Sequence, residues 1–238
     1  MKGYKKLLPA YALVLAGLLF VTVFANRTVT VVSERAPIRN RSTIIIDAGH
    51  GGVDGGATSC TGILESQFNL EISLRLCDLI HLLGYRTKMI RTTDCSIYTS
   101  GDTIAAKKIS DLKERVRIVN ETENGILISI HQNYFSDSRY DGAQVFYAKS
   151  EASRELAGRL QNMLIQTLNH GSRRRAKKAD GIYLMEHIDQ CGVLVECGFL
   201  SNEKEEAKLR EPEYQKELCC VIACALSQYK NPPGNRGI

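Results

Sequence analysis

The chain has 238 residues, of which 44% are hydrophobic, so it is long enough to bury a full core as one domain with a short appendage. The first 42 residues hold seven of its 31 basic residues and one of its 26 acidic residues, which leaves 24 basic and 25 acidic residues from Thr43 onward. The net charge of +5 therefore belongs to the N-terminus, and the neutral body argues against general electrostatic binding to nucleic acid.

The N-terminus has the pattern of an export signal. Lys2, Lys5 and Lys6 precede an uncharged apolar stretch at 7–25, and small residues at its end would suit signal peptidase. The stretch also approaches the roughly 20 residues that span a bilayer. We therefore expect an exported protein in which residues 1–25 are either a signal peptide or a membrane anchor. Residues 26–42 are polar and predict a linker, the folded domain is expected at 43–231, and 232–238 form a tail.

Apolar runs and helical spacings alternate along the folded domain. Strands are predicted at 43–46, 85–90, 125–130, 143–148 and 193–195, and helices at 65–83, 110–121, 152–168 and 213–229. This alternation predicts a single α/β domain with a twisted, mostly parallel sheet flanked by helices.

Eight cysteines in an exported chain would ordinarily suggest disulfides. However, no CxxC pair exists, and Cys77, Cys219, Cys220 and Cys224 fall among apolar residues of predicted helices. Cys191 and Cys197 flank a predicted strand. We expect free thiols, with the loop residues Cys60 and Cys95 as the candidates for a disulfide.

Four polar residues occupy positions typical of an open metal site. His50, His131 and Glu196 follow apolar strands, and Glu65 begins a helix after a glycine-rich loop. The carboxyl ends of parallel strands meet at one edge of a sheet, so these side chains can converge. Two imidazoles and a carboxylate suit a hydrolytic zinc site, in which a second carboxylate moves protons. Taken singly, each residue also fits a commonplace role, such as a turn histidine or a glutamate at a helix N-terminus.

The other histidines lack this setting. His81 lies within a predicted helix, and His170 and His187 lie next to polar segments, so we interpret them as structural or solvated.

Four motifs in order carry a family resemblance. They are Asp47 to Ala57 (DAGHGGVDGGA), Glu65, Ser129 to Asn133 (SIHQN) and Val195 to Asn202 (VECGFLSN). Over residues 43–229 the chain resembles the zinc-dependent N-acetylmuramoyl-L-alanine amidases of the third amidase family. It departs from their usual pattern at Ala48 and Gly192, where a proline is common, but neither change removes a chemical group.

The resemblance implies a function and a site. The substrate would be peptidoglycan, cut at the amide between the lactyl group of N-acetylmuramic acid and L-alanine. His50, Glu65 and His131 would hold Zn²⁺, and Glu196 would be the catalytic acid/base. The metal would lower the pKa of water and polarise the scissile carbonyl. No nucleic acid is expected as a partner.

A narrower resemblance concerns biological role. Small, N-terminally anchored members of the family include sporulation-specific amidases that strip peptides from spore cortex so that muramic lactam forms. The chain has no recognisable wall-binding repeat, so we expect its N-terminal segment or a localising or activating protein partner to place it on its substrate. It would be membrane-anchored or secreted, in the cell-wall space or the forespore intermembrane space. The basic run at 173–178 is interpreted as a solvated loop, with contact to wall carboxylates or phosphates as the alternative.

Three alternatives stay open. A zinc peptidase or deacetylase would use the same metal chemistry on another bond. A non-catalytic or partner-activated wall-binding protein could share the fold. A cysteine-rich metal-binding protein would load metal on its thiols and not on His50 and His131.

Overall fold

The structure is a computed structural model that describes residues 42–229. The predicted N-terminal segment 1–25, nearly all of the linker 26–42 and the tail 232–238 lie outside the described residues, and the boundaries predicted for these segments stay predictions. Within residues 42–229 no helix has the length and hydropathy required to cross a bilayer.

The described part of the chain forms a six-stranded sheet in the order β2-β1-β3-β6-β4-β5. All neighbouring strands are parallel except β4 and β6, which are antiparallel. The predicted α/β class with a mostly parallel sheet is therefore confirmed. The strands are β1 (Thr43–Ala48), β2 (Arg86–Met89), β3 (Gly125–Asn133), β4 (Gln144–Tyr147), β5 (Lys177–Lys178) and β6 (Cys191–Phe199).

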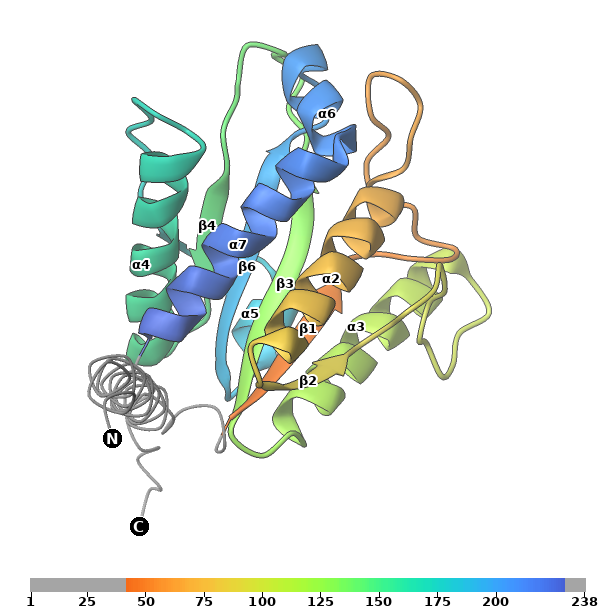
Figure 1. Cartoon of the computed structure of the whole chain (residues 1–238). Helices are drawn as coiled ribbons and strands as arrows, with labels where there is room; N and C mark the ends of the chain where they lie inside the picture. The colour runs from red at the N-terminus through yellow and green to blue at the C-terminus, as the bar shows by residue number, and fades with distance from the viewer. Residues whose placement is uncertain (1–41, 230–238) are drawn as a thin grey trace, which may run out of the picture. The chain divides into compact units, whose positions relative to one another are not determined.

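Helices cover both faces of this sheet. Figure 1 shows α2, α7 and α4 side by side on the face toward the viewer, with α3 and α5 behind the sheet. β1 and β3 are sandwiched between these layers, and their apolar side chains are fully buried. The helices are α2 (Glu65–Leu82), α3 (Ile104–Asn120), α4 (Glu151–Thr167), α5 (Tyr183–His187), α6 (Glu203–Arg210) and α7 (Pro212–Gln228).

Local chemistry fixes the helix ends. The side chains of Thr103, Ser150 and Asn202 accept hydrogen bonds from backbone N–H groups in the first turns of α3, α4 and α6. Gly84, at φ +83°, ends the segment of α2 in a left-handed conformation that glycine adopts without strain.

The structure corrects several predicted boundaries. Helix α3 begins at Ile104, not near residue 110, because Thr103 caps it and Asp111 lies inside it. β3 continues past His131 to Asn133, and β6 extends well beyond 193–195, so Glu196 lies within a strand and not after one. β5, α5 and α6 were not predicted, since each is short and β5 and α6 are almost entirely polar.

All eight cysteines are free, which includes Cys60 and Cys95. Cys197 and Cys219 are buried among apolar side chains, as predicted. Cys220 and Cys224 are exposed, so their predicted role as small core residues is wrong.

Candidate metal centre

The first residue of the centre, His50, lies in a glycine-rich turn directly after β1. His50 adopts φ +61°, and Gly51 and Gly52 after it also have positive φ. Gly49 leaves no room for a side chain, because a Cβ atom there would lie 2.2 Å from the ring of His131. The motif therefore turns the chain sharply at the carboxyl edge of the sheet and lets two histidines approach each other.

Two buried arginines hold this turn through its backbone carbonyls. Arg115 donates to the carbonyl of Ala48 at 3.0 Å and to that of His50 at 2.8 Å. Arg91 donates to the carbonyls of Ala48 at 2.8 Å and Gly49 at 3.0 Å. Arg115 also pairs with the buried carboxylate of Asp47. These bonds satisfy carbonyls that the turn leaves without partners in the sheet and fix the position of His50.

Glu65 begins α2 on the other side of the centre and is only 4% exposed. The backbone N–H of Ala57 donates to its Oε2 at 3.0 Å, and the backbone N–H of Gln132 donates to its Oε1 at 3.1 Å. Asn69, one turn further along α2, donates to Oε1 at 3.3 Å. The carboxylate is thus held in one orientation, with the helix dipole favouring its negative charge.

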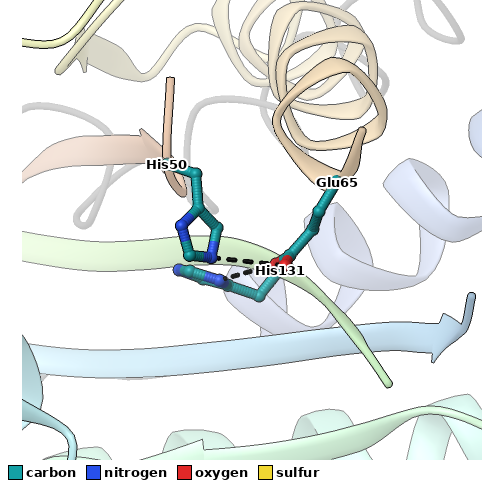
Figure 2. A group of neighbouring side chains, drawn as sticks. All are labelled: His50, Glu65 and His131. Atoms are coloured by element: carbon teal, nitrogen blue, oxygen red, sulfur yellow. Dashed lines mark hydrogen bonds and ion pairs between the residues drawn. The ribbon is translucent and has the colours of Figure 1, made fainter. Parts of the chain in front are cut away.

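Figure 2 shows His50, Glu65 and His131 pointing toward one another from the turn after β1, the start of α2 and β3. Nε2 of His50 lies 3.3 Å from Oε2 of Glu65, and Nδ1 of His131 lies 3.0 Å from Oε1. One ligand atom from each residue lies within 4.8 Å of the others. The structure therefore brings together the three residues that the sequence singled out as ligands.

Asp54 completes the environment of His50. Nδ1 of the imidazole donates to Oδ2 of Asp54 at 2.9 Å, which leaves Nε2 facing the centre. Burial by itself would lower the pKa of His50, but hydrogen bonds with Asp54 and Glu65 raise this pKa to about 9. Burial likewise opposes ionisation of Glu65, yet the two histidines hold its pKa well below the usual range. The sequence contained Asp54 in its first motif, but no local signal revealed this contact.

Glu196 lies beside the cluster on β6, where it is the register partner of His131 on β3. Its Oε2 atom is buried and has no hydrogen-bond partner. Burial raises the pKa of Glu196 to about 7, and the charge of Glu65 adds to this rise, while His131 and His50 oppose it. A carboxylate of this kind exchanges protons near neutral pH, which suits acid/base work.

The residues present fit a divalent metal. Two imidazole nitrogens and a carboxylate oxygen converge, one histidine already has an outer carboxylate that sets its tautomer, and an unpartnered carboxylate oxygen lies close by. His81, His170 and His187 are exposed and lie outside this group, as the sequence indicated.

An α/β fold with this cluster at the carboxyl edge of its sheet is the arrangement expected of a metal-dependent hydrolase, and the three residues are consistent with a metal site. A family model described as N-acetylmuramoyl-L-alanine amidase matches residues 44–228. The chain belongs to this family, Amidase_3, and is an N-acetylmuramoyl-L-alanine amidase that acts on peptidoglycan.

Relatives agree with this assignment. The germination-specific N-acetylmuramoyl-L-alanine amidase of Bacillus subtilis is 35% identical over 194 residues, covering 81% of each chain. The CwlD amidase of Clostridioides difficile, solved in complex with the GerS lipoprotein, is 38% identical with a TM-score of 0.75, covering 79% of this chain and 97% of that one. An N-acetylmuramoyl-L-alanine amidase from Clostridium difficile 630 is 28% identical with a TM-score of 0.69, covering 80% and 97%.

Proposed function

We propose that His50, Glu65 and His131 hold Zn²⁺ and that Glu196 is the acid/base of amide hydrolysis. Nitrogen and carboxylate donors in a set of three, with an open fourth position, are typical of catalytic zinc. The observation that carries the proposal is the pairing of this cluster with Glu196, a partly buried residue on the adjacent strand whose buried Oε2 atom has no hydrogen-bond partner.

Glu196, Asp54 and Glu65 have different roles in the proposed reaction. A bound zinc ion supplies Lewis-acid polarisation of the scissile carbonyl and lowers the pKa of water. Glu196 accepts the proton of the attacking water through Oε2 and donates it to the departing amine nitrogen of L-alanine. Asp54 keeps Nδ1 of His50 protonated, so that Nε2 stays a lone-pair donor. The hydrogen bonds to Glu65 hold its carboxylate still throughout.

A single comparison tests both assignments. The parent protein and Glu196→Gln are compared for metal content and for products released from purified peptidoglycan, analysed by mass spectrometry. The parent should release stem peptides with N-terminal L-alanine, and the variant should bind as much zinc while its rate falls at least about 100-fold. Glu217→Gln, an exposed carboxylate on α7, is the matched control and should keep the parent rate. A Glu196→Gln variant with near-parent activity would refute the catalytic role.

We also propose that the protein works outside the cytoplasm on spore cortex, where peptide removal leads to muramic lactam. The apolar segment at 7–25 after three lysines supports export, and the similarity to a germination-specific amidase supports the cortex role. A lipoprotein partner for placement or activation is part of this proposal, because the similar CwlD amidase was solved with the GerS lipoprotein.

Complementation tests the biological role. The chain is expressed in Bacillus subtilis that lacks its germination-specific amidase, and spore cortex is analysed for muramic lactam. Restored lactam supports the role, with Glu196→Gln as the inactive control. If the parent is present and active on isolated peptidoglycan but the cortex lacks lactam, the cortex role is wrong although the amidase assignment stands.

A further inference from the structure

An exposed aromatic surface, made by Tyr134, Phe135 and Tyr140, lies on the loop that follows β3. These side chains are 54%, 50% and 48% exposed. The ring of Phe135 meets that of Tyr140 edge to face at 4.9 Å, and Tyr140 stacks over the buried ring of Phe199 at 6.1 Å. Exposed aromatic side chains that gather in this way commonly mark a binding surface, and the proposed chemistry makes no use of them.

The loop that carries the rings is fixed, although it is exposed. The backbone N–H of Phe135 donates to Ser201 at 3.2 Å, and Asn202 donates to the carbonyls of Ser138 at 2.8 Å and Tyr140 at 3.2 Å. Figure 1 shows this segment rising from β3 to α6, the helix that Asn202 caps. The aromatic surface is therefore preorganised, and preorganisation lowers the entropy cost of binding a ligand.

The aromatic surface adjoins the metal centre. Tyr134 is the first residue after β3 and follows His131 by three residues, and Phe199, the last residue of β6, follows Glu196 by three. The backbone of each pair can therefore be separated by at most about 10 Å. Figure 1 shows the loop after β3, the loop after α4 and the first turn of α2 at the same edge of the sheet. A polymer whose scissile bond lies at the metal centre would pass over these rings if it ran along this edge of the sheet from the centre toward the loop after β3.

The basic run lies next to the rings. Arg174 donates to the carbonyl of Asp141 at 2.9 Å, and its guanidinium lies 5.1 Å from the ring centre of Phe199. Its neighbours Arg173, Arg175 and Lys177 are exposed, and within residues 42–229 no carboxylate forms an ion pair with them. These side chains give the flank of the aromatic surface an unbalanced positive charge.

We propose that the aromatic surface and its basic flank form an extended subsite for the glycan strand of peptidoglycan beside the scissile bond. A sugar ring has a face of C–H groups that packs on an aromatic ring and a rim of hydroxyl groups that stays in water, which matches side chains that are half exposed. The carboxylates of stem peptides would pair with Arg173, Arg175 and Lys177. The inference rests on the proposed function, because it assigns a substrate-binding role to residues beside the same metal centre.

A sugar polymer fits this surface better than an apolar protein segment does. The rings are interrupted by the ion pair of Asp137 with Arg139, and two of the three exposed rings carry phenol groups. A dry protein interface would leave these charges desolvated, whereas a hydrated glycan keeps them in water. A protein partner at this surface is the occupant that the experiment must distinguish.

The first measurement is binding without turnover. The protein is mixed with insoluble purified peptidoglycan in the presence of EDTA, and the bound fraction is measured after centrifugation. Tyr134→Ala and Tyr140→Ala should each weaken binding roughly threefold to tenfold. Arg173→Gln with Arg175→Gln should weaken binding and flatten its dependence on salt. Leu82→Ala, an exposed apolar residue at the far end of α2, is the control and should bind as the parent does.

The second measurement is a ratio of kcat/KM values. The rate on peptidoglycan strands is divided by the rate on a muramoyl peptide with one sugar, and this ratio should fall threefold to tenfold in Tyr140→Ala. A zinc-loaded parent that cleaves neither substrate would show that the isolated chain needs an activating partner or lacks the proposed chemistry. In either case the subsite stands if the parent binds peptidoglycan in EDTA and the variants bind less. Unchanged binding in the variants, or an equal loss of rate on both substrates, overturns the subsite and leaves the surface to a protein partner or to a role in loop structure.

Discussion

The imidazole of His50 is held between two carboxylates: Nδ1 lies 2.9 Å from Asp54, and Nε2 lies 3.3 Å from Glu65. Asp54 is anchored in turn by Lys108 at 2.7 Å. An outer carboxylate of this kind fixes the tautomer of a ligating histidine and raises its basicity. The position of Asp54 therefore determines which nitrogen of His50 is offered to a metal.

Removing the charge of Asp54 should weaken metal binding. Asp54→Asn should lower the affinity for zinc about tenfold to 100-fold, because the ring of His50 loses its fixed orientation and its anionic partner. Competition with a chromogenic chelator measures this affinity. Asp78→Asn, an exposed aspartate of α2, is the matched control. Equal affinities for the two variants would show that Asp54 does not support the centre.

Protons should compete with the metal at His50. The pKa of His50 in the metal-free protein is raised to about 9, so below that pH most of the imidazole carries a proton that the metal must displace. The apparent affinity should fall as pH falls from 9 to 7, by up to about tenfold per unit while one proton is displaced. Calorimetric titration at pH 7 in two buffers of different ionisation enthalpy measures the release of this proton. Binding at pH 7 without proton release would contradict the prediction.

The raised pKa of His50 should also make the metal-free fold less stable as pH rises from 6.5 to 9. Because the pKa of His50 is raised on folding, its stabilising contribution is fully present below about 6.5 and is lost as pH rises through 9. In Asp54→Asn this loss between pH 6.5 and 9 should shrink. Denaturant unfolding in EDTA across this range measures it.

Arg115 should contribute strongly to the stability of the fold. Its side chain is 3% exposed, and its guanidinium pairs with the buried Asp47 and donates to the carbonyls of Ala48 and His50. Arg115→Met leaves the buried carboxylate of Asp47 with its hydrogen bond from Ser129 but without its charged partner, and should destabilise the fold by roughly 3–5 kcal/mol. Arg117→Met removes an exposed arginine two residues along and should leave the denaturant midpoint nearly unchanged. Similar midpoints for both variants would show that the buried pair contributes little.

Much of this fold was predictable because β1 and β3 are buried on both faces and read as continuous apolar runs. Because the carboxyl ends of parallel strands meet at one edge of a sheet, the sequence also predicted that His50 and His131 lie close together. The extent of β6 was not predictable, since Cys197 and Gly198 after Glu196 have no strand signal, and its length depends on pairing with β3. The contact between His50 and Asp54 depends on a turn with positive φ, which spacing along a sequence does not encode.

Gly49 should tolerate no side chain, and the chain offers a matched control. In Gly49→Ala the new Cβ would lie 2.2 Å from the ring of His131, so either the imidazole or the turn must move. The variant should lose most of its zinc at stoichiometric metal, and overpacking should cost about 1–3 kcal/mol of stability in EDTA. Gly158→Ala, within α4, meets no atom within 4 Å and should gain up to about 1 kcal/mol from better helix propensity. Metal content and denaturant unfolding of both variants provide the measurement. A Gly49→Ala variant that binds zinc like the parent would mean that His131 moves without loss and is not held in place by the glycine turn.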